Sequence, residues 1–190
     1  SGNAGKIKEV ENKFNKYSIK ILSLKNFSNY KEPNEIGNTF SENAKIKSFY
    51  GFLRFKKPCF ADDSGICIEA LNKNPGVNSK TFLESFRNSE TCLNYIINEV
   101  KKTNNFNAFF KTVICLTVSK EKVLYFEGVV NGRISDKIIG AGGFGYDPLF
   151  LPDESESTFA EISLEEKAKI SHRARALAKL VAWLEKAPTN

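Results

Sequence analysis

Apolar positions recur with two different periods along the chain, and these periods predict a mixture of helices and strands. Ile7, Val10 and Phe14 fall at helical spacing, so a first helix is expected to begin near Asn3. Residues 18–24, "SIKILSL", alternate between apolar and polar positions as a strand does. The chain therefore opens with a helix followed by a strand.

Capping and turn signals divide the next part of the chain. Thr39 and Glu42 form a capping box before the helical run "ENAKIKSFYGFLRF". The segment "PCFADDSGICIEA" predicts two short strands broken around two aspartates and Gly65, and "NPGVNS" has the composition of a turn. Residues 89–102, "SETCLNYIINEVKK", predict an amphipathic helix with Ser89 as its N-cap.

The second half of the chain predicts a hairpin and closing helices. "FNAFFKTVICLTV" and "VLYFEGVVNGRI" flank "SKEK" as the strands of a long β-hairpin, so the sheet is expected to be partly antiparallel. Ser163 and Glu166 make a second capping box, and the last helix has an apolar stripe of Leu177, Leu180, Val181 and Leu184. This order predicts one α/β domain over residues 1–190, with a site built from loops at one sheet edge.

Charge and cysteine content narrow the class of protein. Lys and Arg total 28 against 22 Asp and Glu, a formal charge of +6, which suits an anionic ligand or a nucleic acid. The cations are dispersed among acids, and nucleic-acid binders usually gather them in a stripe. The cysteines are scattered without metal spacing, which favours a reducing cytoplasmic location, and no apolar stretch is long enough to span a membrane.

Three segments could carry chemistry. The opening "SGNAGK" has small residues before Lys6 at a helix start, which suits a phosphate, although an ordinary helix cap explains it about as well. Glu35, Asp62 and Asp63 could meet around Mg²⁺, whereas "DDSG" alone also fits a turn. His172 and Arg173 in "SHRAR" start the last helix, where positive charge opposes the helix dipole, so an anion or a purine carbonyl oxygen could compensate.

Seven motifs in order resemble the inosine triphosphate pyrophosphatase family over nearly the whole chain. They are "SGNAGKIKEV", "TFSENAKIKS", "FADDSG", "ALNKNPGV", "GGFGYDPLF", "TFAEIS" and "EEKAKISHRARALAKL". The resemblance implies an α/β fold with a mixed twisted sheet flanked by helices and an active-site cleft between two lobes. Members usually have a hydrophobic strand before the opening motif, so the first strand is expected to be missing from this sequence, which has no Met and opens on Ser1.

The resemblance also implies a set of site residues. Glu35 and Asp63 match the Mg²⁺-binding acids, and Asp63 matches the proton acceptor, with Asp62 beside it. The substrate-binding positions are Ser1, Gly2, Asn3, Ala4, Gly5, Lys6, Lys47, Ser64, Phe144, Gly145, Tyr146, Asp147, Lys167, His172 and Arg173. Phe144 is expected to stack on the base, Asp147 to fix the turn, and Tyr146, Leu149 and Phe150 also suit plain packing.

The implied reaction is hydrolysis of ITP, dITP or XTP to a nucleoside monophosphate and pyrophosphate by a homodimeric enzyme. Donors from His172 and Arg173 would face the oxygen at C6 of the base and reject ATP, while Lys6, Lys47 and Lys167 would neutralise the leaving pyrophosphate. Alternatives are a septum-formation-inhibitor-type pyrophosphatase with another base preference, a basic nucleic-acid-binding module and a silent homologue that serves as a scaffold. Two departures from the family pattern follow: Asn78 stands where an aromatic residue is more usual, and Lys80 and Thr81 occupy a stretch in which many members carry an arginine.

Overall fold

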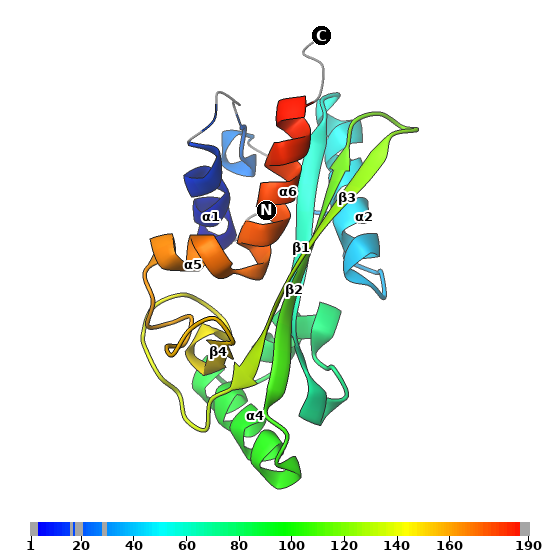
Figure 1. Cartoon of the computed structure of the whole chain (residues 1–190). Helices are drawn as coiled ribbons and strands as arrows, with labels where there is room; N and C mark the ends of the chain where they lie inside the picture. Colours follow the sequence, from blue (N-terminus) through cyan, green and yellow to red (C-terminus); the bar gives the residue numbers. More distant parts are fainter. Residues whose placement is uncertain (1–3, 16, 18–20, 28–29, 187–190) are drawn as a thin grey trace. The chain divides into compact units, whose positions relative to one another are not determined.

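The computed structural model describes residues 4–15, 17, 21–27 and 30–186. It has one four-stranded sheet in the order β1-β2-β3-β4, flanked by helices (Figure 1). The strands are β1 (Cys59–Ile68), β2 (Asn107–Thr117), β3 (Val123–Ile134) and β4 (Phe150–Pro152). β4 pairs antiparallel with β3, with Arg133 opposite Leu151, so the predicted α/β class with a partly antiparallel sheet is confirmed.

Six α-helices and four short 3₁₀ turns complete the described part of the chain. The helices are α1 (Ala4–Phe14), α2 (Phe40–Phe55), α3 (Ser79–Glu84), α4 (Ser89–Thr103), α5 (Leu164–Ile170) and α6 (His172–Lys186). The 3₁₀ turns are Leu24–Asn26, Glu69–Leu71, Gly76–Asn78 and Asp147–Leu149. None of the helices seen in these residues is long and apolar enough to cross a membrane.

The chain divides into two compact units, each built from separate segments. Unit 1 comprises Ser1–Asp63, Thr112–Gly128 and Arg173–Asn190, and unit 2 comprises Ser64–Lys111 and Val129–His172. β1, β2, β3 and α6 each contribute residues to both units. The expectation of a single domain remains a prediction.

In unit 1, the two faces of β2 are covered by different helices. Ile114 and Leu116 point to one face, where they join a buried cluster with Phe14, Phe126, Ala176, Leu177, Leu180 and Val181 of α1, β3 and α6. The alternate residues Cys115 and Thr117 contact α2, whose Ser48 hydroxyl lies 3.1 Å from the Cys115 sulfur and 2.9 Å from the Thr117 hydroxyl. Because side chains alternate along a strand, α6 and α2 cover opposite faces of β2 within this unit.

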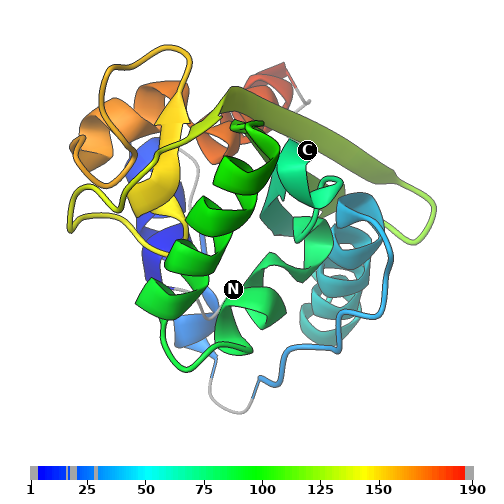
Figure 2. The same ribbon diagram turned by 90° about the horizontal axis from the view of Figure 1, so that it is seen from below.

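In unit 2, α4 supplies most of the helical part of a second core. Its apolar stripe, which includes Leu93, Ile96 and Val100, packs with Ile66 of β1 and Phe110 of β2 in a cluster completed by Ile68, Cys92, Ile97, Ala108, Val130, Ile134, Tyr146, Leu149, Phe150 and Phe159. α3 contacts α4, and the two helices lie side by side in Figure 2. This core therefore buries the helix stripe that the sequence predicts.

Local sequence signals placed most helix starts correctly. The capping boxes at Thr39 with Glu42 and at Ser163 with Glu166 are both formed, and they start α2 and α5. The hairpin of β2 and β3 is present, closed by the Val118 amide donating to the Lys122 carbonyl.

Three predictions of secondary structure were wrong. The segment around the two aspartates is one continuous strand, β1, which pairs with β2; its glycine admits another turn against the strand and does not break it. The N-cap of α4 is Asn88 rather than Ser89, since the Asn88 side chain accepts from the Thr91 amide. Residues 18–20 lie outside the described residues, and residues 21–23 are not a strand. Ile21 packs against the unit 1 cluster, so its burial accounts for an apolar residue here without a partner strand.

Candidate active site

Two carboxylates in unit 1 meet on one lysine. The Lys47 ammonium donates to Glu35 at 2.8 Å and to Asp63 at 3.2 Å. Lys47 lies on α2, Asp63 on β1 and Glu35 in the extended segment before α2. The structure thus brings together three residues that the sequence analysis selected from separate motifs.

A buried amide braces this cluster. Asn43, one turn before Lys47 on α2, donates to the second oxygen of Asp63 at 3.4 Å and accepts from the Gly37 amide at 2.8 Å. Its side chain is buried, and one residue therefore links helix, strand and the segment that carries Glu35. The sequence analysis missed Asn43. It lies four residues after the cap Thr39 and four residues before Lys47, and this helical spacing could have placed it on the same helix face as Lys47.

Asp62 belongs to a different cluster from Asp63. It accepts from Lys6 at 2.9 Å and from the Arg173 guanidinium at 3.3 Å, and Arg173 also pairs with the buried Glu9 of α1. Adjacent residues of a strand point to opposite faces, so Asp62 faces α1 and α6 while Asp63 faces α2. The three acids Glu35, Asp62 and Asp63 therefore do not form one group.

The two aspartates have opposite pKa shifts. Burial raises the pKa of Asp63 to about 6, and neighbouring Glu35 adds to this while Lys47 opposes it. Burial acts in the same sense on Asp62, but Lys6 and Arg173 outweigh it and hold its pKa far below the usual range. Asp63 can therefore take up a proton near neutral pH, whereas Asp62 stays a fixed negative charge.

Arg173 is an internal ion-pair partner in this structure. Only 2% of its surface is exposed, and its guanidinium contacts Glu9 and Asp62. The anions that compensate its charge at the start of α6 thus come from the chain itself. Glu9 was not a predicted site residue, although it lies one helical turn after Lys6.

The loop "GGFGYDPLF" in unit 2 is closed around Asp147. One oxygen of this buried carboxylate accepts from the Phe144 amide at 2.7 Å and from the Lys167 ammonium at 2.6 Å. A side chain at Gly143, where φ is +69°, would place its Cβ 2.1 Å from that oxygen. The glycine is needed for the turn, and the hydrogen bond agrees with the role of Asp147 in fixing it.

Lys167 lies beneath aromatic rings rather than in open solvent. Its ammonium is 4.7 Å from the centre of the Phe144 ring and 5.3 Å from that of Phe159, and the side chain is buried. A cation over ring faces is favourable, and the ion pair with Asp147 compensates its burial. Phe144 itself keeps 37% of its surface exposed, so it can offer its ring to a ligand.

The other predicted residues of unit 2 have distinct surroundings. His172 stacks on Phe110, with ring centres 4.6 Å apart and planes at 9°. Tyr146 is buried and donates its hydroxyl to the Ser79 carbonyl, which agrees with the packing interpretation of this residue. Gly145 has φ of +65°, and Ser64 is half-buried on β1.

The opening motif is only partly described. Ser1, Gly2 and Asn3 lie outside the described residues. Ala4 and Gly5 lie in the first turn of α1, followed by Lys6, so the described part of the motif belongs to the start of this helix.

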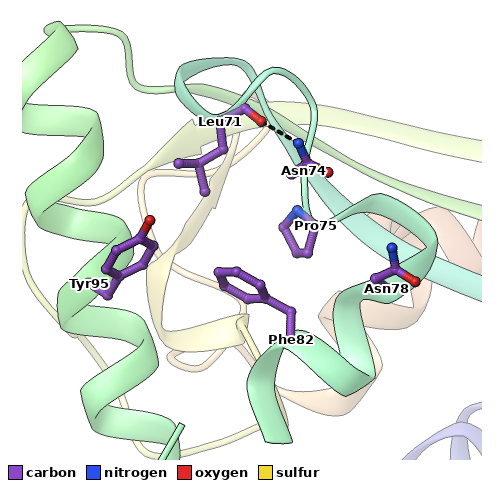
Figure 3. Close-up of a pocket in the computed structure, with 6 residues that line it drawn as sticks. All are labelled: Leu71, Asn74, Pro75, Asn78, Phe82 and Tyr95. Atoms are coloured by element: carbon purple, nitrogen blue, oxygen red, sulfur yellow. Dashed lines mark hydrogen bonds between the residues drawn. The ribbon is translucent and has the colours of Figure 1, made fainter. Parts of the chain in front are cut away.

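A separate cavity of about 310 Å³ lies on unit 2 (Figure 3). It is lined by Leu71, Asn74, Pro75, Asn78, Phe82 and Tyr95, and none of these is a predicted site residue. The rings of Phe82 and Tyr95 lie on one side, across from Asn74 and Pro75 of the turn that precedes α3 (Figure 3). Asn78, one of the positions that departs from the family pattern, thus lies at a surface hollow.

Glu35 and Asp63 are the candidate metal donors near Lys47. Within the residues described, no group of three or more His, Cys, Asp or Glu side chains is placed to hold a metal ion. Two carboxylates converge, however, and Mg²⁺ commonly uses one or two carboxylates together with phosphate oxygens and waters. The donor set therefore fits a hard cation that is completed by its ligand.

The fold and these clusters define an α/β protein with a carboxylate–lysine centre on one unit and an aromatic loop on the other. The Ham1 family model matches residues 1–183, and the chain belongs to the Ham1 family. A dITP/XTP pyrophosphatase of Flavobacterium psychrophilum is 42% identical over 185 residues, covering 97% of this chain and 96% of the relative.

Two solved structures of Ham1 proteins have the same fold. The protein from Coxiella burnetii is 33% identical with a TM-score of 0.88, and that from Staphylococcus aureus is 34% identical with a TM-score of 0.84. Each comparison covers 98% of this chain and 96% of the other. The resemblance inferred from the seven motifs is confirmed.

Proposed function

We propose that this protein hydrolyses non-standard purine nucleoside triphosphates, namely dITP, ITP and XTP, to the nucleoside monophosphate and pyrophosphate. Family membership and the dITP/XTP pyrophosphatase from Flavobacterium psychrophilum support this substrate class. The observation that carries the proposal is the convergence of Glu35 and Asp63 on Lys47.

Asp63 is the proposed proton acceptor. A carboxylate with a pKa of about 6 is ionised at neutral pH but close enough to that pH to accept a proton from an attacking water. Asp62 is unsuitable for this role, because Lys6 and Arg173 hold it ionised. We assign Asp62 instead to fixing Lys6, which with Lys47 supplies positive charge for the phosphates.

Glu35 and Asp63 are the proposed Mg²⁺ ligands. When bound, the ion would offset the negative charge of the triphosphate oxygens. Lys47 now holds the two carboxylates at one point, which supports this choice of ligands.

Phe144 is the proposed stacking partner of the base. Its ring is partly exposed, and its backbone is held by Asp147. Hypoxanthine and xanthine present an acceptor oxygen at C6 where adenine presents an amino group, so a fixed donor rejects ATP. We assign that donor to His172, held flat against Phe110, and assign Arg173 to the ion pairs with Glu9 and Asp62.

Lys167 is assigned to shaping the base loop. Its contacts with Asp147 and Phe144 support this role better than neutralisation of the leaving pyrophosphate. We also infer from the family resemblance that the protein is a homodimer and that it works in the cytoplasm. Light scattering of the purified protein tests whether it is a dimer.

Pyrophosphate release from ITP, XTP, GTP and ATP, with and without Mg²⁺, tests the proposal. We expect ITP and XTP to be hydrolysed at least about 100-fold more efficiently than ATP. Asp63→Asn should lower kcat by about 100-fold or more, since it removes the proton acceptor. The matched control is Asp153→Asn, a surface aspartate in neither cluster, which should keep full activity.

Two outcomes would contradict the proposal. Equal rates with all four nucleotides would indicate a general pyrophosphatase or one with another base preference. Full activity of Asp63→Asn would show that Asp63 is not the proton acceptor.

A further inference from the structure

Ser79, at the start of α3, has a buried hydroxyl that makes two hydrogen bonds. Its Oγ donates to the Gly76 carbonyl at 2.6 Å and accepts from the Ile66 amide of β1 at 3.0 Å. Only 5% of Ser79 is exposed. The hydroxyl therefore ties the turn before α3 to an inner residue of the strand.

The strand accommodates this turn only through Gly65. A Cβ at residue 65 would lie 2.1 Å from the Gly76 carbonyl oxygen and 2.4 Å from the Ser79 hydroxyl. Both distances are far below van der Waals contact, so any side chain there would push the turn away. Gly65 belongs to "DDSG", and this contact gives that glycine a structural reason.

The backbone of the same serine holds the aromatic loop. The buried Tyr146 hydroxyl donates to the Ser79 carbonyl at 2.6 Å. Burial raises the pKa of Tyr146, as does neighbouring Cys92, so the phenol remains a neutral donor at physiological pH. Tyr146 thus anchors the loop to a point that is itself fixed on β1.

The loop has a second anchor one residue further on. Asp147 is bonded to the Phe144 amide and to Lys167, as described above. Phe144 lies just before the two anchored residues, and its ring is the exposed one of the three side chains. Without the Tyr146 bond, the loop would keep the Asp147 contacts and the hydrogen bond from the Gly142 amide to the Ala160 carbonyl at 3.0 Å, but it would lose the bond to Ser79.

We propose that Ser79 is a positioning residue that sets the place of Phe144 through Tyr146, and thereby the affinity for the purine. This inference rests on the proposed function. In this proposal Ser79 does not contact the substrate; it acts by holding the Tyr146 hydroxyl in place. Its loss should therefore weaken contacts with the base and leave those with the phosphates unchanged.

Product inhibition separates these two effects. Inosine monophosphate carries the base and pyrophosphate does not, so each reports on one part of the substrate. In Tyr146→Phe and in Ser79→Ala we expect Ki for inosine monophosphate and KM for ITP to rise about 3- to 10-fold, the equivalent of one hydrogen bond. The Ki for pyrophosphate and kcat should change less than about 2-fold.

Matched controls exist for both variants. Tyr95→Phe removes an exposed phenol hydroxyl, and Ser85→Ala removes an exposed hydroxyl at the end of α3 that also bonds a carbonyl. Neither should alter either inhibition constant. In the double variant Ser79→Ala with Tyr146→Phe, Ki for inosine monophosphate should be about the same as in the more affected single variant, because both substitutions remove the same link.

Each contrary result has a clear meaning. Equal effects on both products, or no effect on either, would overturn the positioning role. If both variants fail to fold, the residues support the fold rather than position the loop, which also overturns it, since one positioning bond is too weak to unfold the chain. A wild-type protein inactive on ITP would instead refute the proposed function, and hydrogen exchange of the 142–147 amides, faster in Tyr146→Phe, would still test the anchor.

Discussion

At the scale of single residues, the chemistry depends on how each charged group is surrounded. Asp62 and Asp63 have the same covalent structure and are adjacent, yet only Asp63 has a raised pKa. The difference comes from their partners: Lys6 and Arg173 for one, and Glu35 with a shared Lys47 for the other. A buried carboxylate that competes with a second one for a single lysine is costly to ionise.

This cost predicts that Asp63→Asn stabilises the metal-free protein. The pKa of the Asp63 carboxyl is raised from 3.8 in the unfolded chain to about 6 in the folded protein. The folded state therefore loses stability as the pH rises from about 4 to about 6, and it does not regain this stability at higher pH. The asparagine variant escapes that loss, and its free energy of unfolding at pH 7.5 should exceed that of wild type by about 1–3 kcal/mol.

Thermal unfolding in EDTA measures this effect. The melting temperature of Asp63→Asn should be higher by about 2–4 °C for each kcal/mol. The gain should vanish below pH 4, where both states are protonated. A gain that is unchanged at pH 4, or a loss at pH 7.5, would contradict the raised pKa.

At the scale of elements, caps and close contacts decide where each segment begins and what it carries. α2 begins at a capping box and holds Asn43 and Lys47 one turn apart, so the start of this helix sets both residues of the unit 1 centre. β1 runs through Gly65 as one strand, and the missing side chain at this glycine admits the turn that contains Ser79.

Thr39→Ala should therefore affect both stability and activity. Loss of the N-cap costs about 1 kcal/mol, and fraying of the first turn reaches Asn43, which braces Asp63. We expect a lower denaturant midpoint with unchanged m-value, together with a several-fold lower kcat for ITP. Thr103→Ala, an exposed threonine at the end of α4, is the control; equal stability of the two variants would show that the cap contributes nothing.

At the scale of the whole molecule, the chain alternates between two cores, each of which is built from separate segments. The chain passes between the units after residues 63, 111, 128 and 172, so neither unit is a continuous stretch of sequence. Since β1, β2, β3 and α6 enter both, unfolding of one core disturbs elements that the other needs. We therefore expect a single cooperative unfolding transition.

Ile96→Ala and Leu180→Ala test this coupling. Both side chains are fully buried, the first in the unit 2 core and the second in the unit 1 core. Each truncation should cost about 2–5 kcal/mol, and calorimetry should show the same single transition moved to lower temperature in both. Two transitions, each shifted by only one variant, would mean that the units unfold independently.

The sequence by itself determined whatever depends on near neighbours in the chain. Thr39 with Glu42 and Ser163 with Glu166 act over three residues, so their helix starts were predictable, as was the hairpin around residues 118–122. The residue types alone suggested that Glu35, Asp62 and Asp63 could meet around Mg²⁺, and the family resemblance added Lys47.

Only the tertiary structure decided what each of these groups contacts. The Ile66 amide of β1 donates to the hydroxyl of Ser79, 13 residues away, and the ion pair of Arg173 with Glu9 joins residues 164 positions apart. Such contacts leave no local pattern, because burial and charge partners are set by chain segments that meet only after folding. The same reason explains why adjacent Asp62 and Asp63 came to have different partners and different chemistry.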